Sequence, residues 1–291
     1  MNLILQGAAT ERAEIERIAA LAQAESIAAL DTSTSMSAPP GAWRCAGALR
    51  NEETAAALDA ACQAAKLDYA FVMPNQRLSD FKLLAMDMDS TLITIECIDE
   101  IADMQGLKPQ VAEITEAAMR GEIEFRESLA RRVALLNGLD AAALQRVYDE
   151  RLKLSPGAEN LLAAAKAAGL KTLLVSGGFT FFTDRIKERL GLDYTHSNRL
   201  EINDGKLTGR VIGGIVDAEE KKNTVLRVCR EIGASPAQAI VMGDGANDLA
   251  MMGVAGMSVA YRAKPVVRAQ ADVALNFTGL DGVLNLFDGV A

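Results

Sequence analysis

The chain has 291 residues, half of them hydrophobic, with 30 Lys and Arg against 39 Asp and Glu, which gives a formal net charge of −9. This length and apolar content argue against a disordered chain and permit two domains with buried cores. The acidic balance argues against a nucleic-acid-binding protein. His196 is the single histidine, so sites that need two histidines are excluded, and we expect catalysis to depend on carboxylates.

The four cysteines, Cys45, Cys62, Cys97 and Cys229, contain no CxxC pair. Their spacing supports neither a zinc site nor a disulfide framework, and it is typical of a reducing cytosol. The first residues lack the basic segment and the long apolar segment of a signal peptide. No stretch of roughly 18 uninterrupted apolar residues predicts a transmembrane helix. We therefore expect a soluble, cytoplasmic protein with neither a membrane partner nor a nucleic-acid partner.

Residues 1–76 predict a small α+β domain. Its expected elements are a strand at 3–5, a helix at 10–24, a loop rich in Ser, Thr and Pro at 31–40, a strand at 43–49, a helix at 52–65 and a strand at 68–73, followed by a turn at 74–77. We interpret the order as βαββαβ, which resembles the ligand-binding ACT-type module in topology. Two roles stay open for this domain: packing within a homodimer, or binding of a regulatory amino acid.

Apolar strands alternate with helices from residue 81 onward. The pattern predicts strands at 81–86, 170–176, 238–242, 257–261 and 271–275, and helices at 180–190, 218–232 and 246–252. Continuous apolar strands separated by helices favour an α/β fold with a doubly wound, Rossmann-like parallel sheet covered on both faces. We assign residues 77–291 to this domain, with a β-hairpin at 196–211. In such sheets ligands bind beyond the carboxyl ends of the strands.

A helical segment at about 96–153 interrupts this alternation after the first strand. Its apolar residues recur at helical spacing, and breaks at 106–109, 120–121 and 137–138 divide it into about four helices. An insertion at this position adjoins the carboxyl ends of the strands. We therefore expect a helical cap that covers the site as a lid.

Asp87 and Asp89 directly follow the strand at 81–86. Two carboxylates at this spacing can point to one side of the chain and share a cation. Aspartates are also common at strand ends because they bond local backbone groups. This pair alone leaves both interpretations open.

Three more segments at strand ends carry groups suited to a phosphate. In the sequence GDGAND at 243–248, glycine permits a sharp turn, and Asp244 and Asp248 supply hard oxygen ligands for Mg²⁺. Ser176 and Gly177 offer a hydroxyl and backbone amides at the start of a helix, as anion binding requires, and Lys222 supplies a cation. Taken one at a time, each segment has a simpler explanation. The segment at 243–248 could be only a loop, Ser176 and Gly177 only a helix start, and Lys222 only a solvated lysine. Their common position at strand ends favours one site.

The aspartates of such a site need a counter-charge. Two carboxylates ~4 Å apart repel by about 4 kcal/mol at an effective dielectric constant of ~20. If Asp89 is protonated, bound Mg²⁺ and Lys222 together balance the charges of Asp87, Asp244 and Asp248. The site then accepts a phosphate dianion although the chain is acidic.

The segments DMDST at 87–91, VSGG at 175–178 and GDGAND at 243–248, with Lys222, resemble the four motifs of the haloacid dehalogenase superfamily of phosphotransferases. From about residue 78 to the C-terminus the chain resembles the phosphoserine phosphatases of that superfamily. The resemblance implies Mg²⁺-dependent hydrolysis of O-phospho-L-serine to L-serine and phosphate, the last step of serine biosynthesis. It implies that Asp87 attacks phosphorus to form an aspartyl-phosphate, and that Asp89 acts as general acid and then as general base.

The resemblance also implies the other contacts of the site. Mg²⁺ would be held by Asp87, the backbone carbonyl of Asp89 and Asp244, with Asp248 as a direct ligand or as the partner of a metal-bound water. The phosphoryl group would be bound by Ser176, Gly177, Lys222 and Asn247.

In the helical cap, Glu96 and Arg132 match the family positions that bind the ammonium and the carboxylate of phosphoserine. Phe125 and Met119 are expected to form an apolar wall. Without the resemblance, Glu96 would be explained as an acid at a helix start, and Arg132 as a surface side chain.

Two further interpretations stay open. The chain could be a phosphatase or phosphotransferase of the same superfamily that acts on another small phosphometabolite. It could also be a non-catalytic phospho-receiver or binding module, because receivers share an aspartate cluster, a Ser or Thr and a lysine at strand ends. The cap and the second acid, Asp89, argue against a receiver, which needs a long-lived phosphate.

Overall fold

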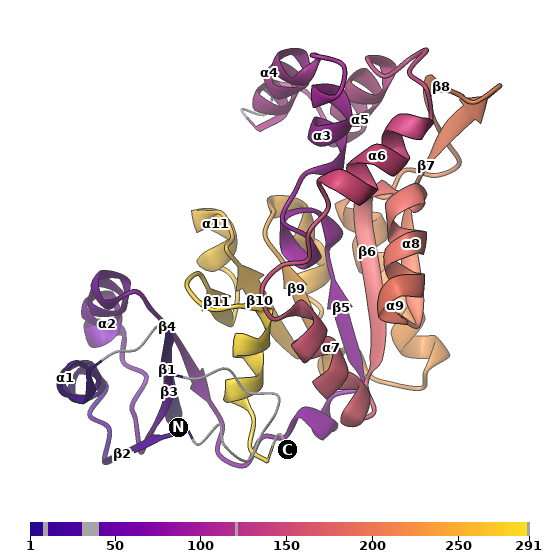
Figure 1. The fold of residues 1–291 in the computed structure, drawn as a ribbon. Coiled ribbons are helices and arrows are strands. Elements are labelled where there is room, and N and C mark those ends of the chain that lie inside the picture. Colours follow the sequence, from indigo (N-terminus) through magenta and orange to yellow (C-terminus); the bar gives the residue numbers. More distant parts are fainter. Residues whose placement is uncertain (8–10, 31–40, 120–121, 290–291) are drawn as a thin grey trace.

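The computed structural model describes residues 1–7, 11–30, 41–119 and 122–289, without the side chain of Met119. Figure 1 shows a small sheet with two helices beside a larger sheet, whose far end is covered by a group of helices. The predicted loop at 31–40 and the predicted break at 120–121 lie outside the described residues. Within those residues, no helix combines the length and the apolar composition that crossing a membrane requires.

The first sheet is antiparallel, with the strand order β2-β3-β1-β4. Its elements follow in the predicted order βαββαβ: β1 (Asn2–Gly7), α1 (Arg12–Leu21), β2 (Ser26–Ala29), β3 (Ala42–Ala46), α2 (Glu52–Ala65) and β4 (Leu67–Val72). Successive side chains of a strand point to opposite faces. Leu3 and Leu5 of β1 pack against the two helices, whereas Ile4 joins the core of the larger sheet. The small sheet therefore has one face covered by helices and the other covered by the rest of the chain.

A buried carboxylate ties the two sheets together. Asp68 of β4 accepts hydrogen bonds from the backbone N–H groups of Asn276, Phe277 and Thr278 at 2.6–3.2 Å, and from the hydroxyl of Thr278 at 2.7 Å. These donors directly follow the last strand of the larger sheet. The predicted boundary at residue 76 falls between the strands of the two sheets, and the domains 1–76 and 77–291 stay a prediction.

The second sheet has seven strands in the order β11-β10-β9-β5-β6-β7-β8. They are β5 (Leu83–Met86), β6 (Lys171–Phe179), β7 (Tyr194–Asn203), β8 (Lys206–Ile212), β9 (Ala239–Gly243), β10 (Met257–Tyr261) and β11 (Val273–Leu275). All neighbours are parallel except β7 and β8, which form the predicted hairpin. The chain builds outward from β5 through β6 on one side and later through β9 on the other. This reversal places a topological switch point, where ligands bind, between β5 and β9.

Helices cover both faces of this sheet. They are α7 (Ala158–Ala167), α8 (Thr180–Leu190), α9 (Ala218–Glu231), α10 (Leu249–Met252) and α11 (Pro265–Arg268). Leu84 and Met86 of β5 pack with α7 and α8, while Leu83 and Ala85 pack with α9. Because the central strands are buried on both faces, their sequences are continuous apolar runs. The doubly wound α/β fold is confirmed.

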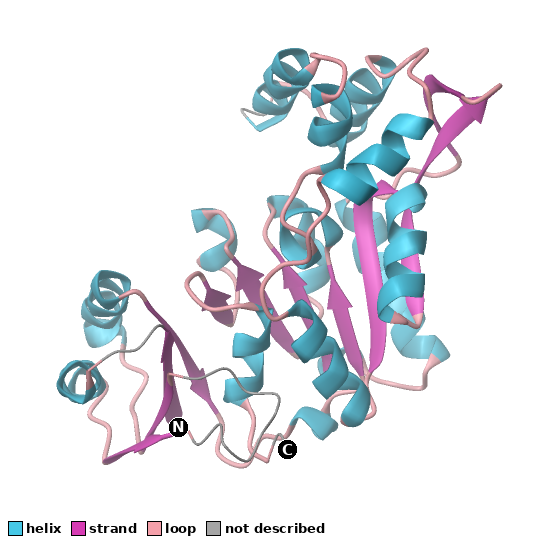
Figure 2. Ribbon diagram, in the orientation of Figure 1, coloured by secondary structure: helices cyan, strands magenta, loops and turns pink. Residues whose placement is uncertain are grey.

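Between β5 and β6 the chain forms the helical cap: α3 (Cys97–Asp103), α4 (Lys108–Met119), α5 (Phe125–Ala134) and α6 (Ala142–Glu150). The arrows of the central strands in Figure 2 point toward these helices, so the helical cap lies over the carboxyl ends of the sheet. The hairpin supports it from one side, because Gly138 donates its N–H to Leu207 at 2.8 Å and Ala141 donates to Gly205 at 2.8 Å. The helical cap therefore lies over the switch point between β5 and β9.

Candidate active site

Asp87 occupies the carboxyl end of the central strand. Its side chain is buried, and one oxygen accepts the N–H of Met88 at 2.7 Å. The chain then turns sharply through residues 88–92, with Ser90 in the left-handed region at a φ of 56°. This turn allows the Ser90 hydroxyl to donate to Glu96 at 2.7 Å. The strand end is thereby connected to the first residue of the helical cap.

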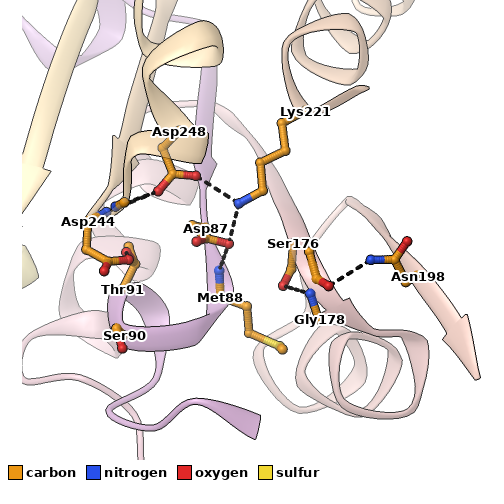
Figure 3. Close-up of polar contacts among 12 residues, drawn as sticks. Asp87, Met88, Ser90, Thr91, Ser176, Gly178, Asn198, Lys221, Asp244 and Asp248 are labelled. Atoms are coloured by element: carbon orange, nitrogen blue, oxygen red, sulfur yellow. Dashed lines mark hydrogen bonds and ion pairs between the residues drawn. The ribbon is translucent and has the colours of Figure 1, made fainter. Parts of the chain in front are cut away.

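Asp87, Asp244 and Asp248 form a carboxylate group whose candidate ligand oxygens all lie within 4.8 Å of one another. Lys221 enters this group from α9, and its ammonium lies 2.8 Å from an oxygen of Asp87 and 2.8 Å from one of Asp248 (Figure 3). Burial alone would lower the pKa of Lys221, but the charges of Asp248 and Asp87 outweigh it and raise that pKa. Lys221 is therefore a permanent cation of the site.

The second oxygen of Asp248 is bonded to backbone. It accepts the N–H groups of Asp244 at 3.2 Å and Gly245 at 3.0 Å. A Cβ on Gly243 would lie 2.4 Å from this oxygen, so the close approach requires glycine there. Both oxygens of Asp248 have partners, which favours a supporting role in holding the loop and Lys221.

The charge of this group fits a divalent cation. Three carboxylates face a single bonded ammonium, which leaves an excess of negative charge. Burial and the charge of Asp248 raise the pKa of Asp87 well above its ordinary value, and the same causes raise that of Asp244 to about 7. Because burial is the first cause and the like charge of Asp248 the second, added positive charge would favour the ionised form of both carboxylates. Hard carboxylate oxygens are the ligands that Mg²⁺ prefers, so the donor set and the charge both fit this ion.

The carboxylate of Asp89 lies apart from that group. One oxygen accepts the backbone N–H of Cys97 at 3.1 Å, and a Cβ built on Gly178 would lie 2.7 Å from the other. Burial, followed by the charge of Glu96, raises the pKa of Asp89 to about 7. Asp89 can therefore carry or release a proton near neutral pH, while its carboxylate is kept away from the three other aspartates.

The phosphate-side residues of β6 are held by their own chain and by Asn198. The hydroxyl of Ser176 is buried and accepts the N–H of Gly178 at 2.8 Å. Asn198 donates to the carbonyl of Gly177 at 2.7 Å and accepts the N–H of Val216 at 2.8 Å. Sequence reasoning missed Asn198, which is a fully buried polar residue within a strand. It fixes the Gly177 backbone relative to the segment that precedes α9.

The structure corrects the predicted lysine. Lys222 lies at the surface, where it pairs with Glu219 at 2.7 Å, and Lys221 takes the position in the site. Adjacent helix residues point about 100° apart, so only one of two neighbouring lysines can face the sheet. Helical spacing identifies Lys221 as the buried lysine, because it lies on the same face of α9 as the buried residues Thr224, Val225 and Val228.

A cavity of about 670 Å³ separates the helical cap from the sheet. Its walls include Asp87, Asp89, Asp244, Ser176, Gly177 and Asn247 from the sheet side and Glu96, Phe125 and Arg132 from the cap side. These predicted residues are thus brought together. Asp99 and Lys264 also line the cavity and were not predicted.

The cap side of the cavity offers two acids, Glu96 and Asp99, and one base, Arg132. Partial desolvation raises the pKa of Glu96, while its bond from Ser90 and the charges of Arg132 and Lys264 act in the opposite direction. Burial lowers the pKa of Arg132, opposed by Asp99 and Glu96. Phe125 lies against Gly177, since a Cβ there would be 3.2 Å from the ring.

The family model of haloacid dehalogenase-like hydrolases matches residues 81–256 of this chain. A phosphoserine phosphatase of Polaromonas sp. is 63% identical over 218 residues, which are 73% of this chain and 92% of that protein. The chain belongs to the haloacid dehalogenase-like hydrolases, in the phosphoserine phosphatase family. This confirms the resemblance that the motifs indicate.

Solved structures of the family extend the likeness to the whole fold. A haloacid dehalogenase family hydrolase of Salmonella enterica serovar Typhi covers 99% of this chain with a TM-score of 0.89 at 30% identity, and 98% of that chain is matched. A substrate-bound phosphoserine phosphatase matches 72% of this chain and 99% of its own, with a TM-score of 0.67 at 36% identity. The first likeness includes the N-terminal antiparallel sheet.

Proposed function

We propose that this chain hydrolyses O-phospho-L-serine to L-serine and phosphate, with Mg²⁺, through an aspartyl-phosphate on Asp87. The observation that carries this proposal is the cavity. One wall presents Asp87 and Asp244, and the other presents Glu96 and Arg132. Lys221 lies behind the first wall, where its ammonium is 2.8 Å from an Asp87 oxygen. A phosphate ester that also bears an ammonium and a carboxylate matches both walls.

Phosphoryl transfer would begin with attack of an Asp87 oxygen on phosphorus, which forms the phosphorus–aspartate bond as the phosphorus–serine oxygen bond breaks. Asp89, whose pKa is about 7, would give its proton to the departing serine oxygen. As a carboxylate it would then take a proton from the water that hydrolyses the aspartyl-phosphate. One residue thus performs both proton transfers.

The equatorial phosphoryl oxygens need positive charge and donors. Lys221, the Ser176 hydroxyl, the Gly177 amide and Asn247 would supply them in fixed positions. Mg²⁺, when bound, supplies further neutralisation of the phosphoryl oxygens. Asp87, the backbone carbonyl of Asp89 and Asp244 would hold it, with Asp248 beside them.

Substrate choice would depend on the helical cap. The planar guanidinium of Arg132 can bind a carboxylate with two parallel hydrogen bonds, and Glu96 can pair with an ammonium. Removal of Arg132 is expected to lower kcat/KM for phosphoserine by about 10–100-fold, the usual value of a hydrogen bond to a charged group. An aryl phosphate, which has neither group, should be affected much less.

Release of phosphate from L-phosphoserine and from a panel of sugar phosphates tests this function. Phosphoserine should be hydrolysed fastest, and only with Mg²⁺ present. Arg131→Ala provides a matched control for Arg132→Ala, because Arg131 is exposed and pairs with Glu127 on its own helix. Turnover of phosphoserine no faster than that of the sugar phosphates would overturn the substrate assignment. Equal losses on phosphoserine and on an aryl phosphate would point to folding damage.

We further place this reaction in the cytoplasm, as the last step of serine biosynthesis. The four cysteines are free and buried, which fits a reducing compartment. A homodimer and a regulatory amino acid bound by the N-terminal sheet stay predictions. Sedimentation of the whole chain tests the first, and calorimetric titration of the whole chain with L-serine tests the second.

A further inference from the structure

Asp217 directs its two carboxylate oxygens to different parts of the molecule. One oxygen accepts the N–H of Glu220 at 3.0 Å and so caps the N-terminus of α9. The other accepts the Nε of Arg126 at 2.8 Å and lies 2.6 Å from an Nη atom of the same guanidinium. The first contact belongs to the sheet domain, and the second comes from α5 of the helical cap.

The helix that Asp217 caps is the one that delivers Lys221 to the site. The N–H of Lys221 bonds to the carbonyl of Asp217 at 2.9 Å, so Lys221 lies in the first turn of α9. Its side chain is 1% exposed and is held between Asp87 and Asp248. A shift in the start of this helix would therefore move the ammonium relative to the reacting oxygens.

The arginine that Asp217 binds lies next to a cavity residue. Arg126 follows Phe125, whose ring lies against Gly177 and lines the cavity. The Arg126–Asp217 ion pair joins a cap helix to the sheet domain. The other ion pair of α5, Arg131 with Glu127, stays within that helix.

We infer that Asp217 is a positioning residue that couples closure of the helical cap to the placement of Lys221. One oxygen sets the start of α9, and the other holds α5 over the cavity through Arg126. The effect on turnover rests on the proposed phosphatase function, whereas the coupling between the two residues does not.

The pair has the strength expected of a reversible contact. The Asp217 side chain is 19% exposed and that of Arg126 is 63% exposed, so water screens the interaction. The N–H of Glu220, then the bond from Arg126, lowers the pKa of Asp217 and keeps it ionised. Exposed ion pairs change an equilibrium by about 1.5- to 5-fold. This value favours the closed position while it still allows substrate to enter and product to leave.

Three substitutions separate the two roles of Asp217. Arg126→Ala removes only the contact to the helical cap, Asp217→Asn keeps a good helix-capping side chain but loses the charge, and Asp217→Ala loses both. We expect the first two to raise KM for phosphoserine by about 1.5- to 5-fold with kcat nearly unchanged. Asp217→Ala should in addition lower kcat, because Lys221 loses its fixed position. Arg131→Ala is the matched control and should change neither constant.

Salt provides a readout that a merely structural role would not move. At 1 M salt the screening length falls to about 3 Å, so the ratio of KM between Arg126→Ala and the wild-type chain should approach one. The Arg126→Ala, Asp217→Asn double variant should resemble either single variant. A KM of Arg126→Ala equal to that of Arg131→Ala, or single effects that simply multiply in the double variant, would overturn the inference.

A measurement without substrate distinguishes failure of this inference from failure of the proposed function. A double-mutant cycle on urea unfolding compares the wild-type chain, the two single variants and the double variant. We expect the pair to contribute about 1.5- to 5-fold to the unfolding equilibrium constant. Zero coupling would overturn the inference even if phosphoserine is hydrolysed, and an inactive wild-type chain would overturn only the proposed function.

Discussion

Replacing Lys221 with methionine is expected to remove most of the activity, whereas Lys222→Met should leave it nearly unchanged. Lys221 is 1% exposed and lies 2.8 Å from a carboxylate oxygen of each of Asp87 and Asp248. Lys222 pairs with Glu219 at the surface of the same helix. The two variants therefore remove the same charge from adjacent positions, one inside the site and one outside it.

The loss of stability in Lys221→Met depends on the carboxylates of Asp87 and Asp248, which stay buried without their cation. Removing one partner of a buried ion pair typically costs about 3–5 kcal/mol, because the other charge stays buried without compensation. Protonation relieves part of this cost, since the pKa of Asp87 is already raised by burial and by Asp248. We therefore expect a loss of unfolding free energy near the lower end, about 3 kcal/mol. The exposed Lys222 pair should contribute at most about 0.5 kcal/mol.

The catalytic loss is separate from the loss of stability. Lys221 would supply fixed positive charge to the phosphoryl oxygens, and loss of one such group lowers kcat by about 10²–10³-fold. Phosphate release from phosphoserine at saturating Mg²⁺ measures this loss, and urea unfolding measures stability. If the methionine variant does not fold, Lys221→Arg is the second test, because it keeps the positive charge. It should still lose activity, because a guanidinium is larger than the ammonium held there. A folded Lys221→Met chain with near-wild-type kcat, or equal losses in both methionine variants, would refute the reasoning.

Three other outcomes are expected. Asp87→Asn should stop turnover and leave no phosphorylated chain after acid quenching, as measured by mass spectrometry; retained turnover would place the nucleophile elsewhere. The second outcome concerns stability in EDTA. The pKa values of Asp89 and Asp244 are both about 7 against an ordinary 3.8, so between these values the folded state binds more protons than the unfolded state. The unfolding free energy should therefore fall as the pH rises from about 4 to about 7. Mg²⁺ should reduce this fall, and a rise in stability over the same interval would contradict the raised pKa values of these two carboxylates. Gly178→Ala would place a Cβ 2.7 Å from Asp89 and should lower kcat by about 10–100-fold, while Gly214→Ala, with no atom within 4 Å, should leave kcat unchanged.

Sequence pattern predicts the elements whose burial is uniform or strictly periodic. The predicted helices at 52–65 and 180–190 have the observed bounds of α2 and α8. The central strands are buried on both faces and are found as apolar runs. The predicted order βαββαβ includes the strand β2, but no residue range was predicted for it, because its four residues are largely exposed and carry no alternation. The helix α7 was not placed either, because its alanine-rich sequence has no marked polar face.

The motifs predict which strand ends meet, but contacts between distant segments decide the details of the site. A motif that requires a lysine does not choose between Lys221 and Lys222, and only packing of α9 against the sheet settles it. The bond between Ser90 and Glu96 depends on the left-handed turn at Ser90. The side chain of Asn198 forms hydrogen bonds with the backbone of both Gly177 and Val216, and these two segments are connected by no local sequence pattern.

Asp89 gives this chain an acid–base group near neutral pH, although its single histidine pairs with Glu220 at 3.1 Å and does not line the cavity. Burial and then the charge of Glu96 raise the pKa of Asp89 to about 7. In the proposed reaction Glu96 binds the substrate ammonium, which cancels part of the negative charge that raises this pKa. Substrate binding then makes Asp89 a stronger acid while the serine oxygen needs a proton. Departure of serine restores the charge of Glu96 and makes Asp89 a stronger base for the water that follows, so Glu96 contributes to the rate of both steps as well as to affinity.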